Sequence, residues 1–158
     1  MYNVETLLYI VKGNKVLLIE KKRGLGAGLY NGVGGKVEKG ETPIEAAIRE
    51  CEEEIGVIPK NIRWVGLLEF YNNGSLYGFV HVFLADDYEG ELKETGEAKP
   101  VWFEIDKLPF DKMWGDDIYW LPLALKEIKF YAVFHFEKWE KITKKEIYVL
   151  KEYQQWQT

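Results

Sequence analysis

A glycine-rich segment that runs directly into a capped helix is the feature that most constrains the fold of this chain. Glycine recurs throughout residues 24–40, so the backbone there either turns sharply or approaches another group closely; a plain surface loop is the alternative. Thr42 and Glu45 form a Thr-x-x-Glu capping box around Pro43, which predicts that a helix begins here. Gly56 predicts its end.

The predicted helix has two faces. At about 100° per residue, its apolar residues fall in one stripe that predicts a core face: Ile44, Ala47, Ile48, Cys51 and Ile55. Cys51 is therefore expected to pack in the core rather than to act as a nucleophile. The other face carries Glu50, Glu53 and Glu54 at positions i, i+3 and i+4. Such neighbouring charges repel, so this face is either a solvated acidic surface or a site where a divalent cation offsets the repulsion.

The surroundings of these carboxylates favour the cation. Ala46 lies on the same face, and its small side chain would leave room for hydrated cations and phosphate oxygens. The glycine-rich segment brings its own backbone to the N-terminal end of the helix, where carbonyl oxygens can join the carboxylates. An oxygen-only ligand set suits Mg²⁺, or Mn²⁺ in its place. The sequence therefore predicts a metal and phosphate site.

The rest of the chain reads mainly as strands, with one more helix. Alternating or apolar runs bounded by turn residues predict strands over 6–11, 15–21, 61–71, 77–85, 98–105 and 130–136, and one last strand followed by a polar end between 138 and 158. A second helix is expected over 116–128, capped by Asp116 and Asp117. His81 and His135 fall within alternating strands, which favours structural over catalytic histidines.

Composition limits the possible partners. The 158 residues suit a single domain, 1–158. With 21 Lys+Arg against 26 Asp+Glu, a net charge of −5 argues against a long nucleic acid or an anionic membrane. No apolar run is long enough to span a membrane, and a cytoplasmic, monomeric protein is expected. One cysteine allows no internal disulfide and no zinc site.

The spacing of glycine, acidic residues and arginine resembles the Nudix box over residues 35–57: Gly35, five residues, Glu41, seven residues, then Arg49-Glu50-Cys51-Glu52-Glu53-Glu54-Ile55-Gly56-Val57. Further matches resemble the MutT-type branch that hydrolyses oxidised purine nucleotides, namely residues 21–24, 26–28, 31–32 and 34–37 before the helix and 109–120 after it. The chain departs from that branch at Leu25, Tyr30 and Gly115, and its turn at 72–74 is one residue longer. These departures bear on substrate preference rather than on reaction class.

The resemblance implies a fold and a reaction. The fold is α/β, a mixed β-sheet in an α/β/α sandwich with a loop–helix–loop Nudix motif. The reaction is the Mg²⁺-dependent hydrolysis of oxidised purine nucleoside triphosphates, such as 8-oxo-dGTP or 2-hydroxy-dATP, to nucleoside monophosphate and pyrophosphate. A triphosphate carries about four negative charges, so binding to this acidic chain requires metal. A broader nucleoside triphosphate pyrophosphohydrolase and a non-catalytic nucleotide-binding module are the alternatives.

The resemblance also implies roles for individual residues. The metal ligands implied are Gly35, Glu50, Glu53, Glu54 and Glu97. Glu53 is the preferred general base and Glu97 the alternative, although an ordinary loop glutamate would equally account for Glu97. Arg49 is expected to pair with Glu41 and to brace the loop against the helix.

Substrate contacts are expected from a set of residues far apart in the sequence: Thr6, Lys21, Asn31, Phe70, Trp114, Asp116 and Asp117. Lys21 is either a phosphate contact or a solvated strand-end lysine. Trp114 supplies a stacking surface. Two adjacent carboxyl groups in a partly desolvated pocket repel, so Asp116 and Asp117 can share one proton and meet both donors and acceptors of a purine.

Overall fold

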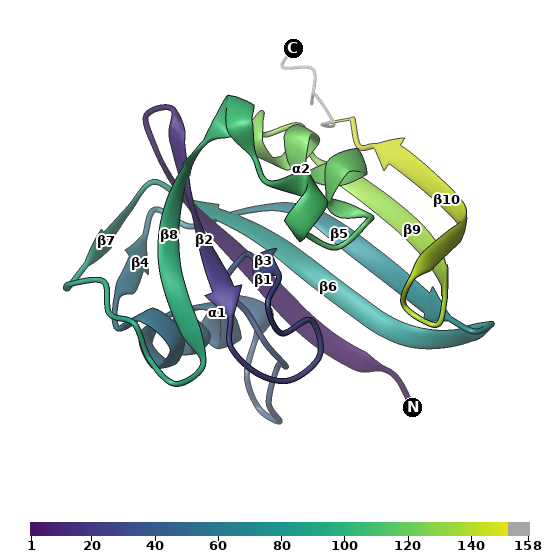
Figure 1. Cartoon of the computed structure of the whole chain (residues 1–158), viewed down its shortest axis with the longest axis horizontal. Helices are drawn as coiled ribbons and strands as arrows, with labels where there is room; N and C mark the ends of the chain where they lie inside the picture. Colours follow the sequence, from purple (N-terminus) through teal and green to yellow (C-terminus); the bar gives the residue numbers. More distant parts are fainter. Residues whose placement is uncertain (152–158) are drawn as a thin grey trace, which may run out of the picture.

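The computed structural model describes residues 1–151 and contains one large mixed sheet with a helix on each face (Figure 1). The strands are β1 (Asn3–Lys12), β2 (Lys15–Lys21), β3 (Tyr30–Asn31), β4 (Ile58–Lys60), β5 (Arg63–Asn72), β6 (Ser75–Ala85), β7 (Asp87–Glu89), β8 (Ala98–Glu104), β9 (Phe130–Glu137) and β10 (Lys141–Val149). The helices are α1 (Pro43–Ile55) and α2 (Asp117–Leu125), with single 3₁₀ turns at Ile105–Lys107 and Phe110–Lys112. The expected polar end at 152–158 lies outside the described residues.

The strands of the sheet separate between β1 and β2. Its order is β10-β9-β5-β6-β1-β2-β3, with β8 also paired to β2. The pairs β1–β6 and β5–β9 are parallel and the other neighbours antiparallel. β1 and β2 pair only beside their turn, at Val11↔Val16 and Lys12↔Lys15. Beyond those pairs the glycine-rich segment takes the place beside β1, where Leu8 exchanges two backbone hydrogen bonds with Val33. The glycine-rich segment is thereby inserted into the sheet, beside β1.

Alternation along the strands gives the sheet two buried faces. In β1 and β2, Tyr9 and Leu18 belong to the cluster beneath α2, whereas Leu8, Ile10 and Leu17 belong to the cluster beneath α1. A helix covers each face because a sheet that is apolar on both sides must bury both. The α/β/α sandwich is therefore confirmed. The short strands β3, β4 and β7 were not predicted; β4 and β7 form a separate ribbon next to α1.

Helix α1 begins as predicted, but its buried side is rotated. Both hydrogen bonds of the Thr42–Glu45 capping box are present, and Gly56 ends the helix with φ of 77°. Cys51 is fully buried, as expected, whereas Ile44 is 40% exposed, contrary to the expected stripe. Ala46 is fully buried, so it fills space rather than leaving room for cations. The glycine-rich segment packs on this side of the helix, where the Gly34 N–H donates to Glu54, and Glu54 is buried there as well.

Helix α2 is shorter than expected, and the Asp pair does not cap it. Asp116 stands at the N-cap with helical backbone angles and makes no side-chain cap hydrogen bond. The histidines have structural partners: Nδ1 of His81 accepts from Trp64 Nε1 at 3.1 Å, and His135 stacks on Tyr71 at a centroid distance of 4.4 Å. Within residues 1–151, no helix is long and apolar enough to cross a membrane.

Candidate active site

The site begins where the glycine-rich segment touches both β1 and α1. The Thr6 N–H donates to the Gly35 carbonyl oxygen at 2.9 Å, and the Gly34 N–H donates to Oε2 of Glu54 at 3.1 Å. A Cβ atom on Gly34 would lie 1.7 Å from the Thr6 carbonyl oxygen, and one on Gly35 would lie 2.7 Å from the Glu50 carboxylate. Gly34 has to be glycine because a Cβ atom there would clash with backbone, whereas a Cβ atom at Gly35 would displace the Glu50 side chain. The glycine pair therefore brings the backbone against the acidic face of α1.

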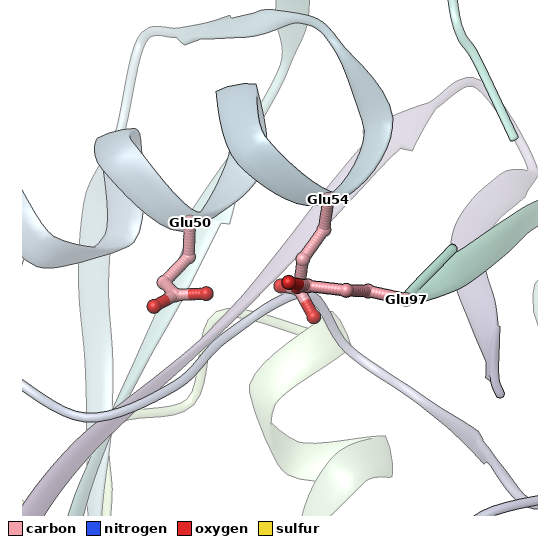
Figure 2. A group of neighbouring side chains, drawn as sticks. All are labelled: Glu50, Glu54 and Glu97. Carbon is pink, nitrogen blue, oxygen red and sulfur yellow. The ribbon is translucent and has the colours of Figure 1, made fainter. Parts of the chain in front are cut away.

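Three carboxylates converge at this point (Figure 2). Oxygen atoms of Glu50, Glu54 and Glu97 all lie within 4.8 Å of one another. Burial, and then the charge of Glu50, raise the pKa of Glu54 to about 8. Burial likewise raises the pKa of Glu50. Because the three groups supply only hard oxygen donors and are destabilised by their mutual repulsion, they fit a divalent cation such as Mg²⁺ or Mn²⁺.

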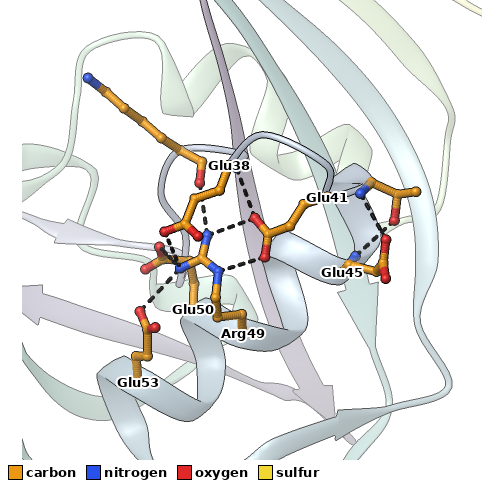
Figure 3. Close-up of polar contacts among 8 residues, drawn as sticks. Glu38, Glu41, Glu45, Arg49, Glu50 and Glu53 are labelled. Carbon is orange, nitrogen blue, oxygen red and sulfur yellow. Dashed lines mark hydrogen bonds and ion pairs between the residues drawn. The ribbon is translucent and has the colours of Figure 1, made fainter.

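Arg49 binds acidic side chains of both the helix and the loop before it (Figure 3). Its guanidinium donates to both carboxylate oxygens of Glu41, at 2.7 and 3.0 Å, and to the Lys36 carbonyl oxygen at 3.0 Å. It also donates to Glu50 at 2.7 Å and to Glu53 at 3.2 Å. These hydrogen bonds raise the pKa of Arg49, so it stays charged and ties the loop to the helix.

Glu53 lies apart from the carboxylate cluster. Its side chain is 52% exposed and is paired with Arg49. Ala46, Glu50 and Glu54 follow one another at i, i+4 and i+8, which places them in one line facing the glycine-rich segment. Glu53 instead reaches the Arg49 guanidinium (Figure 3). The geometry thus brings together Glu50, Glu54 and Glu97 and leaves Glu53 beside them.

A pocket of ≈ 400 Å³ extends from this cluster toward α2. It is lined by every residue expected to contact substrate, namely Thr6, Lys21, Asn31, Phe70, Trp114, Asp116 and Asp117, together with Glu54. Among the described residues, the Thr6 Oγ1 and Asn31 Nδ2 atoms are the buried side-chain polar atoms without a hydrogen-bond partner. Because burying a polar atom without a partner is costly, both atoms are suited to meeting a polar ligand.

The Asp pair closes the inner end of this pocket. Asp116 and Asp117 are 3% and 4% exposed, and Trp120 Nε1 donates to Oδ2 of Asp116 at 2.7 Å. Burial raises the pKa of Asp116 to about 6. Burial and the neighbouring Asp116 raise the pKa of Asp117 well above its ordinary value. The raised pKa values favour protonation of one of the two carboxyl groups, and a pair that holds one proton can both donate and accept a hydrogen bond.

The protonated pair predicts a pH-dependent stability. Because folding raises these carboxyl pKa values, the pair contributes most to stability below pH ~4 and loses that contribution as the pH rises past about 6. We expect the free energy of unfolding of the wild type, relative to Asp117→Asn, to fall by at least about 1 kcal/mol between pH 4 and pH 8. Urea denaturation at both pH values measures it. Asp111→Asn, at an exposed aspartate, is the control; a pH-independent difference would contradict the assignment.

Lys21 lies between the two ends of the site. Its Nζ donates to the Leu25 carbonyl oxygen at 2.8 Å, and the residue lines both the main pocket and a smaller neighbouring pocket with Arg23, Glu54 and Glu97. It is thus placed beside the carboxylate cluster.

Several pocket residues were not expected from the sequence, among them Glu5, Tyr77, Phe136 and Trp139. Strand alternation separates the two faces of β6 and β9. It gives no signal for which face meets the pocket, and Trp139 belongs to a turn.

Comparison with known proteins agrees with this geometry. A family model described as NUDIX domain matches residues 1–124. The chain is 47% identical over 133 residues to a Danio rerio protein named oxidized purine nucleoside triphosphate hydrolase, covering 84% of this chain and 85% of that protein. A Mus musculus protein of the same name is 44% identical over the same shares. The crystal structure of a MutT protein from Bacillus halodurans superposes with a TM-score of 0.81 at 26% identity, covering 92% of this chain and 97% of that one. This chain therefore belongs to the NUDIX family.

Proposed function

We propose that this chain hydrolyses oxidised purine nucleoside triphosphates, such as 8-oxo-dGTP, to nucleoside monophosphate and pyrophosphate. The observation that carries the proposal is one pocket whose lining includes both Glu54 of the carboxylate cluster and the Asp116–Asp117 pair. Triphosphate and base therefore each have a complementary end. The animal relatives named for this activity share nearly half of their aligned residues with this chain.

The base end offers donors and acceptors on both sides of a flat ring system. Trp114 lines the pocket beside the Asp pair and supplies an aromatic surface for stacking. One protonated and one ionised carboxyl group can meet the O6 acceptor and the N1 and N2 donors of an oxopurine. Asn31 has a free amide group for the opposite edge. Moving the proton between Asp116 and Asp117 would adapt the pair to adenine-type bases such as 2-hydroxyadenine.

The phosphate end is suited to a metal-assisted displacement. When bound, Mg²⁺ or Mn²⁺ would neutralise phosphate charge between Glu50, Glu54 and Glu97 and acidify water. Gly35 and Glu53 complete the ligand set that we propose. Lys21 supplies a positive charge to the triphosphate. A glutamate, Glu53 or Glu97, accepts a proton from the water that attacks the β-phosphorus.

A kinetic panel with Mg²⁺ tests this proposal. We expect kcat/KM to be higher for 8-oxo-dGTP than for dGTP, ATP or ADP-ribose, and activity to be lost without divalent metal. In ¹⁸O-labelled water the label should appear in pyrophosphate; label in the monophosphate would place the attack at the α-phosphorus. Equal kcat/KM for 8-oxo-dGTP and dGTP would favour a broader pyrophosphohydrolase, and binding without turnover would favour a nucleotide-binding module.

The same proposal covers the assembly and cellular role. We propose a monomer as the working form. Hydrolysis of damaged nucleotides in the cytoplasm would keep them from being incorporated into DNA.

A further inference from the structure

The turn between β9 and β10 places two bulky residues in a backbone conformation that usually takes glycine or asparagine. Lys138 and Trp139 are consecutive non-glycine residues with φ of 52° and 55°. This left-handed conformation is unfavourable for residues that carry a Cβ. Strain of this kind persists where surrounding contacts hold it, and it is concentrated at functional sites.

The neighbouring turn between β5 and β6 supplies those contacts. Oδ1 of Asn73 accepts from the Lys138 N–H at 2.8 Å, and Oδ1 of Asn72 accepts from the Trp139 N–H at 3.0 Å. The Asn73 N–H donates in turn to the Phe136 carbonyl oxygen at 2.9 Å. The two turns lie side by side at the same end of the sheet (Figure 1). The asparagine pair, Asn72 and Asn73, thus acts as a clamp on the strained turn.

The clamp places the Trp139 side chain at the pocket. Trp139 lines the pocket and contacts Trp114, with ring centroids 6.0 Å apart at 71°. It also packs on Phe136 at 5.5 Å and edge-on against Tyr77 at 5.0 Å. The Tyr77 hydroxyl is itself fixed by a hydrogen bond to Glu5. Trp139 is therefore the centre of an aromatic wall that continues the stacking surface of Trp114.

We propose that Trp139, held by the Asn72–Asn73 clamp, is a specificity-determining residue that keeps Trp114 in position and limits the pocket to bases of purine size. This inference rests on the proposed function, because it concerns the base end of the same site. A glycine or asparagine would form the left-handed turn at lower cost, yet the chain keeps a large indole there. That indole forms part of the pocket wall.

Steady-state kinetics on variants of the wall and the clamp test the proposal. We expect Trp139→Ala to raise KM for 8-oxo-dGTP about fivefold, because aromatic contact area is lost, while kcat stays within about twofold since the carboxylate cluster is untouched. The base of 1,N6-etheno-dATP has three fused rings. In Trp139→Ala, kcat/KM for this larger substrate divided by kcat/KM for 8-oxo-dGTP should rise about tenfold, because part of the pocket wall is removed. Trp139→Phe should change both quantities less and in the same direction.

The clamp is tested by a matched pair of substitutions. Asn72→Ala removes the acceptor for the Trp139 N–H and should shift KM and the substrate ratio in the direction of Trp139→Ala. Asn72→Asp keeps an acceptor oxygen for the Trp139 N–H and should have the wild-type KM and substrate ratio. Asn61→Ala is the control, because Asn61 also has a left-handed backbone, with φ of 56°, in a turn outside the pocket. Thermal denaturation confirms that each variant is folded.

Two results would overturn the inference. One is that Trp139→Ala and Trp139→Phe both have the KM and the substrate ratio of the wild type. The other is an equal loss of kcat/KM on both substrates, with Asn72→Ala no different from Asn61→Ala, since that pattern indicates a purely structural residue. Binding of 8-oxo-dGMP in the absence of metal, monitored by tryptophan fluorescence, distinguishes failure of the Trp139 inference from failure of the proposed function. A wild type that binds 8-oxo-dGMP without turning over any triphosphate overturns the function alone, and weaker binding by Trp139→Ala then supports the inference.

Discussion

Glu54→Gln is expected to lower kcat/KM for 8-oxo-dGTP by about 10²- to 10⁴-fold, the loss typical of removing a carboxylate that holds metal and substrate charge in place. Glu54 is the most buried member of the carboxylate cluster, at 6% exposure. Glutamine keeps the shape of the side chain and an oxygen that accepts from the Gly34 N–H. The substitution also removes the repulsion from Glu50 that contributes to the raised pKa of Glu54. The melting temperature should therefore match or exceed that of the wild type.

Comparison with neighbouring glutamates makes this prediction specific. Glu52→Gln changes an exposed glutamate on the same helix and should leave kcat/KM within about twofold. Glu53→Gln and Glu97→Gln separate the two candidates for the general base, because the larger fall in kcat identifies the proton acceptor. A Glu54→Gln protein with wild-type activity would refute the role of the carboxylate cluster. A lowered melting temperature would instead indicate that the carboxylate stabilises the fold.

Asp116→Asn and Asp117→Asn are each expected to raise KM for 8-oxo-dGTP about tenfold or more, since a wrongly paired buried polar group costs ~1 to 3 kcal/mol. An asparagine cannot exchange the shared proton, so the donor and acceptor pattern that meets the oxopurine is lost. Asp116 also accepts a hydrogen bond from Trp120 Nε1. In Asp116→Asn, the acceptor of that hydrogen bond becomes an amide group.

The metal end supplies the internal control for this prediction. Titration with Mn²⁺ should give the wild-type affinity in both variants, because the carboxylates of Glu50, Glu54 and Glu97 remain in place. Asp111→Asn, at an exposed aspartate, should leave KM unchanged. Unimpaired KM values in both pocket variants, combined with equal kcat/KM on 8-oxo-dGTP and dGTP, would reduce this protein to a general nucleotide hydrolase.

Local sequence rules predicted the elements that depend on nearby residues. The capping box at Thr42 and Glu45 and the terminating Gly56 define α1 because each makes its hydrogen bonds within a few residues. The main strands follow from alternation for the same reason. The short strands β3, β4 and β7 have no such pattern, since each is two or three residues long and exists only because a distant strand pairs with it.

The positions of the acidic residues could not be predicted from local sequence rules alone. Spacing placed Glu50, Glu53 and Glu54 on one face, yet the structure pairs Glu53 with Arg49 and brings Glu97, an expected ligand from a distant loop, next to Glu50 and Glu54. The Asp pair presented the same ambiguity between a helix cap and a buried recognition pair. The structure buries both side chains and shows no side-chain cap hydrogen bond from Asp116; recognition of the base by the pair stays a prediction.

The sequence by itself determined the catalytic motif, the α1 helix that carries it and the strands around it, because these depend on short-range hydrogen bonding and on periodic burial. Only the tertiary structure decided which side of α1 is buried, which carboxylates meet, and that Trp139 joins Trp114 at the pocket. Those outcomes depend on contacts between residues far apart in the chain, such as the Asn72 side chain with the Trp139 backbone. Such contacts form only when the whole sheet has brought the two turns together.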